Sequence, residues 1–394
     1  MKQAWRAADR AAEVLGAARG WRAAGRIDDA ALAAFAEAHP EPGPRLGWAW
    51  RVLVFVCVVV GTAAATALGF VLLGVREAGS AAAIFLAAGA ALALLTDAIV
   101  ERSSFRPTGA EAATSLLGVS YLMFAAFALG DHFHLRETHA QRLALGWGAA
   151  VLAFAAWRWG FRVYAGAAAG ALLLLAAHLP APRLAWLAAA SVIALVANAA
   201  LARRDLCPSH RGGVGLARTV ALAAIYVAAN YYAADKGFIE DIAREPGAPR
   251  HRAGEITLRL AWAGSALWPI ILVAWGLRAR DRALIALGVV VAALSLATVR
   301  FYLHLAPLWL VLAASGAALA GASLLLERWL RSGRDGERGG FTAAPLYDES
   351  RGERLLPVAA ALASAPEART LPEDPRGVHG GGGGFGGGGA GGTY

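Results

Sequence analysis

Long uninterrupted apolar stretches alternate with short gaps that carry arginine along most of the chain. Most of them reach the roughly 17–25 residues that a helix needs to cross the hydrocarbon core of a bilayer. A water-soluble core could not bury so many such runs, whereas a bilayer accepts them once helices pair their own backbone groups. We therefore predict an all-α, polytopic transmembrane helix bundle of about ten spans, with nine or eleven as alternatives, at 49–74, 80–100, 112–130, 143–157, 163–179, 184–202, 216–234, 258–277, 283–299 and 306–326.

Both flanks of the predicted bundle, 47–327, have a different pattern. Residues 1–46 are predicted to form a small helical pair outside the membrane, with Asp28 as the N-cap of the second helix and a Pro-rich stretch after it. Residues 328–394 are rich in Arg, Glu, Pro and Gly, and 380–392 are almost all glycine. Such a segment cannot offset its ordering entropy, so we predict a disordered tail.

The charges of this chain collect at the ends of the spans. The 394 residues are 58% hydrophobic and only 16% charged, with a formal net charge of +9 carried almost wholly by arginine. Placing the N-terminus inside puts ten loop arginines on the cytoplasmic side and five in the short external loops. The positive-inside rule then predicts that both termini are cytoplasmic. We expect the lipid bilayer, and no nucleic acid, to be the partner of these arginines.

The predicted spans contain few polar residues, and their central depths lack charged ones. Tyr121, Asn198, Tyr226 and Asn230 are interpreted as donors and acceptors between helices. Because ion-coupled transporters usually place ionisable groups at mid-membrane, their absence argues against such a machine. It leaves a carrier of a neutral solute open, for which the two asparagines would serve.

Three further residues bear on how the helices pack or bend. Pro269 interrupts the eighth span and predicts a kink, which is a possible hinge. Gly166 and Gly170 form a GxxxG in the fifth span, a spacing that permits close helix approach.

Histidines gather on the predicted external side. The short segment after the third span contains Asp131, His132, His134 and His139, and His304 is placed on the same side. Imidazole and carboxylate groups bind Zn or Cu, and histidine also titrates near neutral pH. A divalent metal site and a pH sensor are therefore alternatives to ordinary interfacial histidines, and no other cofactor is predicted. The two cysteines, Cys57 and Cys207, lie at different predicted depths and form no CxxC pair.

Two short resemblances concern the ends of the chain. The segment Trp21-x-x-x-Gly25-Arg26-Ile27-Asp28, followed by an Ala-rich helix and spans that start at Trp48, resembles the N-terminus of a bacterial family of multipass membrane proteins of unknown function. The Gly-rich tail is similar to those of TPM-domain-type membrane proteins. The first resemblance and the Arg-rich, Lys-poor usage imply a bacterial inner membrane, and neither resemblance brings catalytic residues.

Three functions are compatible with this pattern. The first is a non-enzymatic scaffold, sensor or assembly factor that recruits partners through the N-terminal helical pair or the tail. The second is a transporter or channel for a neutral or lipidic solute. The third is a membrane enzyme with an external site of Asp131, His132 and His134, to which His304 can be added. The pattern favours a protein that is not an enzyme, and the catalytic residues stay unknown.

Overall fold

The computed structural model describes most of the chain up to residue 342. The described residues are 3–23, 25–39, 47–102, 108–203, 205–242, 244, 253–303, 308–333, 337–338 and 341–342. The chain divides into two units, Met1–Val311 and Leu312–Tyr394, and each is described by itself. The predicted boundaries at 46/47 and 327/328 stay predictions, and the Gly-rich tail lies outside the described residues.

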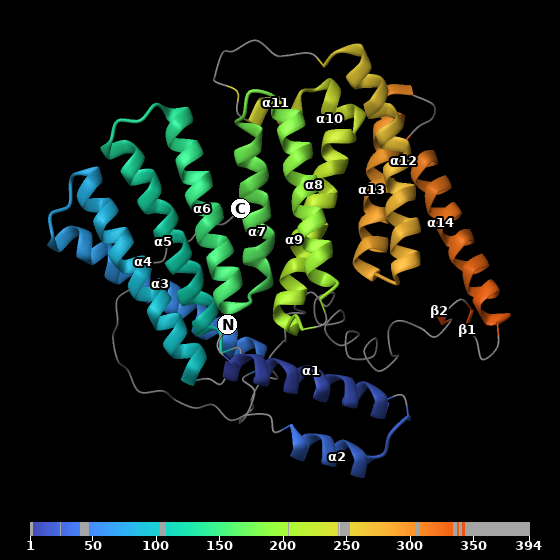
Figure 1. The fold of residues 1–394 in the computed structure, drawn as a ribbon, viewed down its shortest axis with the longest axis horizontal. Coiled ribbons are helices and arrows are strands. Elements are labelled where there is room, and N and C mark those ends of the chain that lie inside the picture. Colours follow the sequence, from blue (N-terminus) through green and yellow to red (C-terminus); the bar gives the residue numbers. More distant parts are fainter. Residues whose placement is uncertain are drawn as a thin grey trace, which may run out of the picture. The chain divides into compact units, whose positions relative to one another are not determined.

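Each of the ten predicted spans overlaps a long helix (Figure 1). These helices are α3 (Trp48–Leu72), α4 (Ala78–Arg102), α5 (Ala110–His132), α6 (Glu137–Trp159), α7 (Arg162–Ala177), α8 (Pro182–Leu201), α9 (Pro208–Ala229), α12 (Glu255–Ala279), α13 (Arg282–Leu303) and α14 (Leu308–Arg331). Two short helices, α10 (Tyr231–Asp235) and α11 (Phe238–Ile242), follow α9. The predicted all-α bundle is therefore confirmed.

Seven of these helices are long and apolar enough to cross a bilayer, which makes the chain a multipass membrane protein. They are α3, α4, α5, α8, α9, α12 and α13. Helices α6, α7 and α14 lie at predicted spans but are not among the seven, and α7 has only 16 residues. Within the described residues, length and apolarity thus support seven of the roughly ten predicted spans.

Two helices precede the bundle, as predicted. They are α1 (Gln3–Ala23) and α2 (Asp29–Ala38). Asp28 caps α2, because its side chain accepts a hydrogen bond from the N–H of Ala31 at 2.8 Å. The rings of Trp21 and Phe35 lie 6.2 Å apart and join the pair. Helix α1 also contacts α9.

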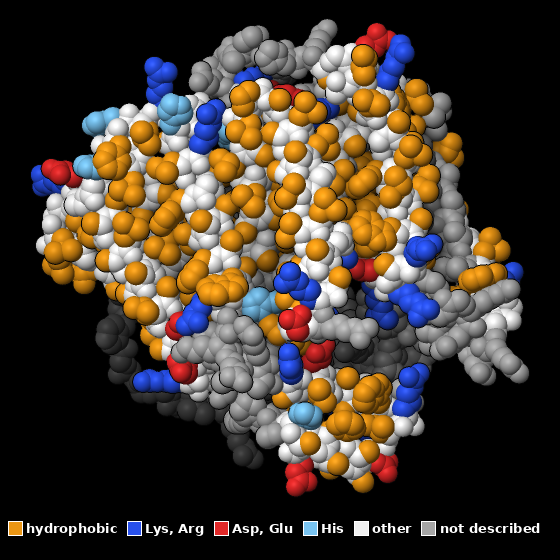
Figure 2. All heavy atoms as spheres, viewed as in Figure 1, with side chains coloured by type: hydrophobic (Ala, Val, Ile, Leu, Met, Phe, Trp, Pro, Cys, Tyr) orange, Lys and Arg blue, Asp and Glu red, His pale blue; other side chains and the backbone are white. Residues whose placement is uncertain are grey.

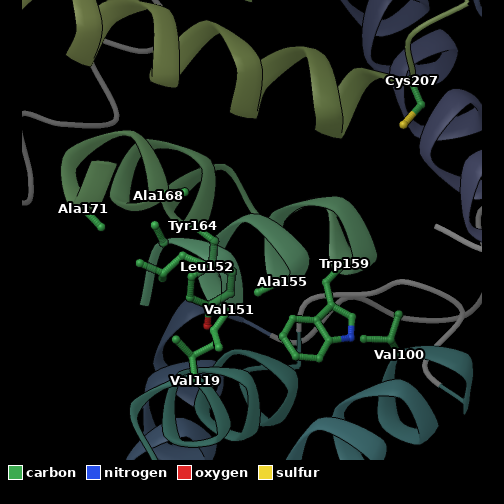
Figure 3. Packing of buried hydrophobic residues seen from close by; sticks show 11 residues of the cluster. Val100, Val119, Val151, Leu152, Ala155, Trp159, Tyr164, Ala168, Ala171 and Cys207 are labelled. Atoms are coloured by element: carbon green, nitrogen blue, oxygen red, sulfur yellow. The ribbon is translucent and has the colours of Figure 1, made fainter. Parts of the chain in front are cut away.

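Within the first unit, consecutive helices pack mainly against their neighbours along the chain, and α7 and α9 also pack together. Small residues allow the backbones to approach closely. A Cβ at Gly89 of α4 would lie 3.1 Å from the carbonyl oxygen of Gly118 in α5. A cluster around Trp159 and Tyr164 joins α4, α5, α6 and α7 (Figure 3).

The surface of the helices is largely apolar. Helix α3 buries none of its residues and exposes large side chains such as Trp48 and Val71. Figure 2 shows apolar side chains spread over the helices, with charged side chains mostly at their two ends. This distribution fits a bundle whose middle faces lipid.

The second unit begins within α14. After that helix, β1 (Glu337–Arg338) and β2 (Phe341–Thr342) pair antiparallel as a small hairpin.

Candidate functional site

The helix of the seventh predicted span is broken. Helix α9 ends at Ala229, Asn230 has an extended backbone with φ −85° and ψ 134°, and α10 begins at Tyr231. The side chain of Asn230 caps α10, because its Oδ1 accepts from the N–H of Ala233 at 3.1 Å. The expectation of one continuous span over 216–234 is therefore wrong at this point.

A neutral, buried hydrogen-bond network surrounds the break. Asn230 Nδ2 lies 2.8 Å from the hydroxyl of Tyr226 and 3.1 Å from that of Thr298, and the Tyr226 hydroxyl lies 3.0 Å from Ser295. From α12, Ser265 Oγ accepts from the N–H of Tyr231 at 2.9 Å. Side chains of α9, α12 and α13 thus satisfy polar groups that the break would otherwise leave unpaired in a membrane.

Helix α12 reaches the break because it has a glycine at the crossing. A Cβ at Gly264 would lie 2.5 Å from the carbonyl oxygen of Ala229, the last residue of α9. Real Cβ atoms do not approach a backbone oxygen so closely. The broken end of α9 and the backbone of α12 can therefore pack in this way only with glycine at position 264.

A cavity of about 900 Å³ lies beside the break. Its lining comes from α9, α10, α11, α13 and the turns between them: Tyr226, Val227, Asn230, Tyr232, Ala233, Lys236, Phe238, Asp241, Ile242, Leu294, Ala297, Thr298 and Phe301. Most of these side chains are apolar or aromatic, with hydroxyl and amide groups near the break and two charged groups, Lys236 and Asp241. Such a mostly apolar cavity with few polar groups is typical of a small-molecule site.

Charged and aromatic side chains surround the α10–α11 region. Lys236 Nζ lies 3.0 Å from Asp235 and 5.8 Å from the centre of the Phe301 ring. The hydroxyl of Tyr302 donates to Asp235 at 2.5 Å. Arg183 of α8 binds Glu240 through two nitrogens, at 3.1 and 3.3 Å. Aromatic and charged groups together are typical of the level where a bilayer meets water.

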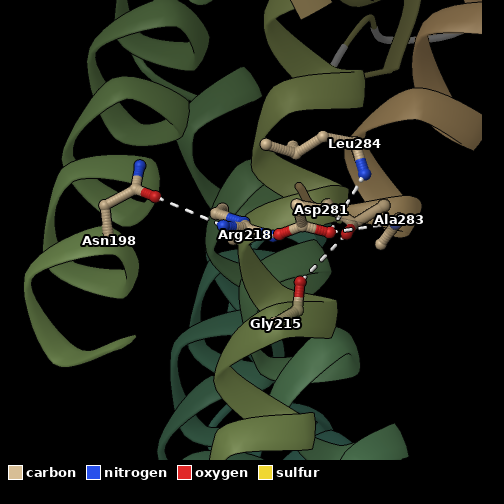
Figure 4. Close-up of polar contacts among 7 residues, drawn as sticks. Asn198, Gly215, Arg218, Asp281, Ala283 and Leu284 are labelled. Carbon is tan, nitrogen blue, oxygen red and sulfur yellow. Dashed lines mark hydrogen bonds and ion pairs between the residues drawn. The ribbon is translucent and has the colours of Figure 1, made fainter. Parts of the chain in front are cut away.

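A second polar cluster lies at the middle of α9, where the turn between α12 and α13 meets this helix (Figure 4). Arg218 of α9 is buried and forms an ion pair with Asp281, in the turn between α12 and α13. Asp281 also accepts from the N–H of Ala283 at 2.9 Å and so caps α13. Burial alone would raise the pKa of Asp281, but the hydrogen bond and charge of Arg218 and the backbone N–H groups outweigh it and hold this pKa below its ordinary value.

The histidine-rich segment forms the end of α5, the turn after it and the start of α6. Asp131 and His132 end α5, His134 lies in the turn with φ +50°, and His139 begins α6. The His132 ring packs against Gly79, where a Cβ would lie 2.9 Å from Nδ1.

Among the described residues, no group of three His, Cys, Asp or Glu side chains lies together as a metal site. His304 lies outside the described residues. The external metal site and the enzyme built on it therefore stay predictions.

The predicted kink and the predicted GxxxG contact lie in α12 and α7. Pro269 is buried within α12, which runs through it as one helix. A Cβ at Gly166 of α7 would lie 2.9 Å from Leu216 of α9, whereas nothing lies within 4 Å at Gly170. The close approach of α7 and α9 is thus at the first of the two glycines, and the hinge at Pro269 stays a prediction.

Sequence reasoning noted Tyr226 and Asn230 but not the break between them. Asparagine before two tyrosines, in a stretch otherwise rich in alanine, is the signal that points to an interruption. Ser265 and Thr298 carry no such signal, because hydroxyl residues are common in membrane helices. Comparisons of the chain with protein-family models, with curated proteins and with solved structures find no match.

Proposed function

We propose that this chain is a carrier for a lipidic solute, which it binds in the cavity beside Asn230. The observation that carries this proposal is the cavity beside the interruption of α9, since an interrupted membrane helix presents polar groups that can bind a solute. Non-helical backbone is tolerated at membrane depth only where it is buried in protein or lines a cavity. Here it borders a cavity of about 900 Å³, which has room for a drug-sized ligand.

The lining of the cavity supports a lipidic solute rather than an ion. The network around Asn230 is neutral, and Leu294, Ala297 and Phe301 provide an apolar wall along α13. Leu294 and Phe301 are each about half exposed, so this wall continues onto the surface that faces lipid. A solute with an apolar chain can enter there from the bilayer without crossing water.

We also propose that the protein lies in a bacterial inner membrane with both termini cytoplasmic, in keeping with the resemblance of its N-terminal segment. The distribution of arginines among the loops supports this orientation. The cavity then opens in the external half of the bilayer, and α1 and α2 lie on the cytoplasmic side. A recruiting role for these two helices is a second proposal, supported by the contact of α1 with α9.

The carrier proposal is tested by filling the cavity. The purified chain is placed in lipid nanodiscs with a photoreactive fatty acid, and the labelled peptides are mapped by mass spectrometry. We expect labelling on the α9–α11 and α13 peptides, and Ala297→Trp should reduce it several-fold. Val290→Trp is the matched control, because Val290 lies two turns earlier on the same exposed face of α13 and does not line the cavity.

A second measurement separates a carrier from a receptor. Proteoliposomes with a fluorescent lipid in both leaflets are treated with an impermeant quencher, and a carrier should expose the inner-leaflet fraction faster than empty vesicles do. Ala297→Trp should abolish that increase and Val290→Trp should keep it. Labelling that is equal in both variants, or spread evenly over the bundle, would overturn the proposal.

A further inference from the structure

A cysteine and a histidine lie in contact at the start of α9, far from the cavity. Cys207 is the N-cap residue of this helix, and its sulfur lies 2.7 Å from Nδ1 of His210. The other ring nitrogen of His210, Nε2, lies 2.9 Å from the carbonyl oxygen of Trp157. The thiol thus contacts one nitrogen of the imidazole, and a carbonyl oxygen that orients the ring contacts the other.

The carbonyl oxygen determines which nitrogen of His210 carries the proton. A carbonyl can only accept, so Nε2 must donate to Trp157 and carries the hydrogen. In a neutral imidazole the other nitrogen, Nδ1, is then an acceptor, and the S–H of Cys207 donates to it. If the proton moves to Nδ1, the imidazolium still donates to both the sulfur and the carbonyl. His210 is therefore placed as the base for this thiol.

Cys207 lies at the N-terminus of α9, the positive end of the helix dipole. The N-terminus of a helix carries a partial positive charge, which stabilises a thiolate there. The first turn of α9 contains no acidic residue. Arg162 of α7 lies against the second turn of α9, since a Cβ at Gly212 would lie 2.2 Å from its Nε.

Cys207 is shielded, and this limits what can reach it. Its residue is 5% exposed. Figure 3 shows it apart from the other labelled residues, beside the dark blue ribbon of the N-terminal helices, in line with the contact between α1 and α9. A reagent no larger than a few atoms fits such a place better than a bulky electrophile.

We propose that Cys207 and His210 form a peroxide-reactive thiol site. The thiol proton passes to His210 Nδ1, and the sulfur attacks one oxygen of a hydroperoxide. An S–O bond forms as the O–O bond breaks, and the leaving hydroxide or alkoxide takes the proton from His210, releasing water or an alcohol. Sulfur is oxidised by two electrons to a sulfenic acid and the peroxide is reduced, so the step balances.

The test compares Cys207 in the folded and in the unfolded full-length chain. The protein in detergent, or unfolded in denaturant, is treated with hydrogen peroxide in the presence of dimedone, which traps sulfenic acids, and labelling at Cys207 is followed by mass spectrometry. Cys57 cannot serve as the reference, because it lies on the surface of the membrane helix α3, which detergent covers. We expect Cys207 to be labelled at least about tenfold faster in the folded chain, since unfolding takes His210 away from the sulfur.

His210→Asn tests the role of the base. The asparagine keeps an acceptor near the position of Nδ1 but takes up no proton, so labelling at Cys207 should fall by about tenfold or more. His139→Asn, at an exposed histidine of α6, should leave it unchanged. A merely structural role for His210 would change the unfolding temperature and not the rate.

Two results would overturn this proposal. They are labelling of Cys207 that is no faster in the folded chain than in the unfolded chain, and an unaltered rate in a folded His210→Asn protein. The comparison of the folded with the unfolded chain tests the proposal even if that variant does not fold.

Discussion

The middle and the end of α9 accommodate buried polar groups in different ways. At the middle, Arg218 is a buried charge that is paired with the carboxylate of Asp281, from another part of the chain. At the end, Asn230 is neutral and is held by several hydroxyl groups. A buried charged side chain needs an oppositely charged group close to it, whereas a neutral amide can form hydrogen bonds to several helices.

This difference explains why the cavity lies at the end with Asn230. An ion pair draws α9 and the α12–α13 turn together and leaves little room between them. A network of hydroxyls tolerates an interrupted backbone, and the interruption separates α9 from α10 beside α13. The Arg218–Asp281 pair is therefore interpreted as a clamp between α9 and the α12–α13 turn, and the end of α9 at Asn230 as the binding end.

Removing the carboxylate of the clamp should have the largest effect. Asp281→Ala leaves Arg218 buried without its ion-pair partner and removes the cap of α13, so we expect a loss of about 3–5 kcal/mol in the free energy of unfolding. The measurement is unfolding by denaturant in detergent. Glu255→Ala is the control, because it breaks an exposed pair with Arg259 within one helix, which contributes only a few tenths of a kcal/mol. Similar losses in the two variants would contradict the clamp.

Substitution of Gly264 should cause the second largest loss of stability. In Gly264→Ala the new methyl group meets the carbonyl oxygen of Ala229, so α12 must move away from the break. We expect a loss of about 1–3 kcal/mol despite the better helix propensity of alanine. Gly170→Ala, where nothing lies within 4 Å, should be neutral or stabilising by up to about 1 kcal/mol. Thermal unfolding of both variants in one detergent decides between these outcomes.

Substitution of Asn230 should cause the third largest loss of stability. Asn230→Ala removes the cap of α10 and the bonds to Tyr226 and Thr298, and each hydrogen bond between membrane helices contributes only about 0.6 kcal/mol. We expect a loss of about 1–2 kcal/mol, together with weaker photolabelling at the cavity. Asn198→Ala, which removes only a 3.5 Å contact with Arg218, should cost less and leave labelling unchanged. A labelling pattern that Asn230→Ala does not alter would separate the network from the binding site.

The dependence of stability on pH should be the smallest effect. The pKa of Asp281 is lowered in the folded protein, so this carboxylate contributes stability above the ordinary aspartate pKa. That contribution should be lost as the pH falls through the lowered folded value. Unfolding curves of the native chain and of Asp281→Asn, taken from neutral to acidic pH, check this expectation. The variant should show the weaker decline, and parallel declines would rule out Asp281 as the cause.

The sequence predicted well whatever depends on local pattern. The positions of the ten helices follow from the length of each apolar run, and the cap at Asp28 follows from a rule that involves four neighbouring residues. The number of spans was less certain, because α6 and α7 combine apolar stretches with a lower overall apolarity or a shorter length. Tyr226 and Asn230 were recognised as polar residues, but their common network was not.

The sequence by itself determined that this chain is a helical membrane protein, because the hydrophobic effect and backbone pairing act on each span separately. Only the tertiary structure decided where a helix is interrupted and which distant residues meet. Arg218 and Asp281 are 63 positions apart, and Asn230 and Thr298 are 68 apart. Contacts of this kind depend on how the helices pack, which no periodicity along the chain encodes.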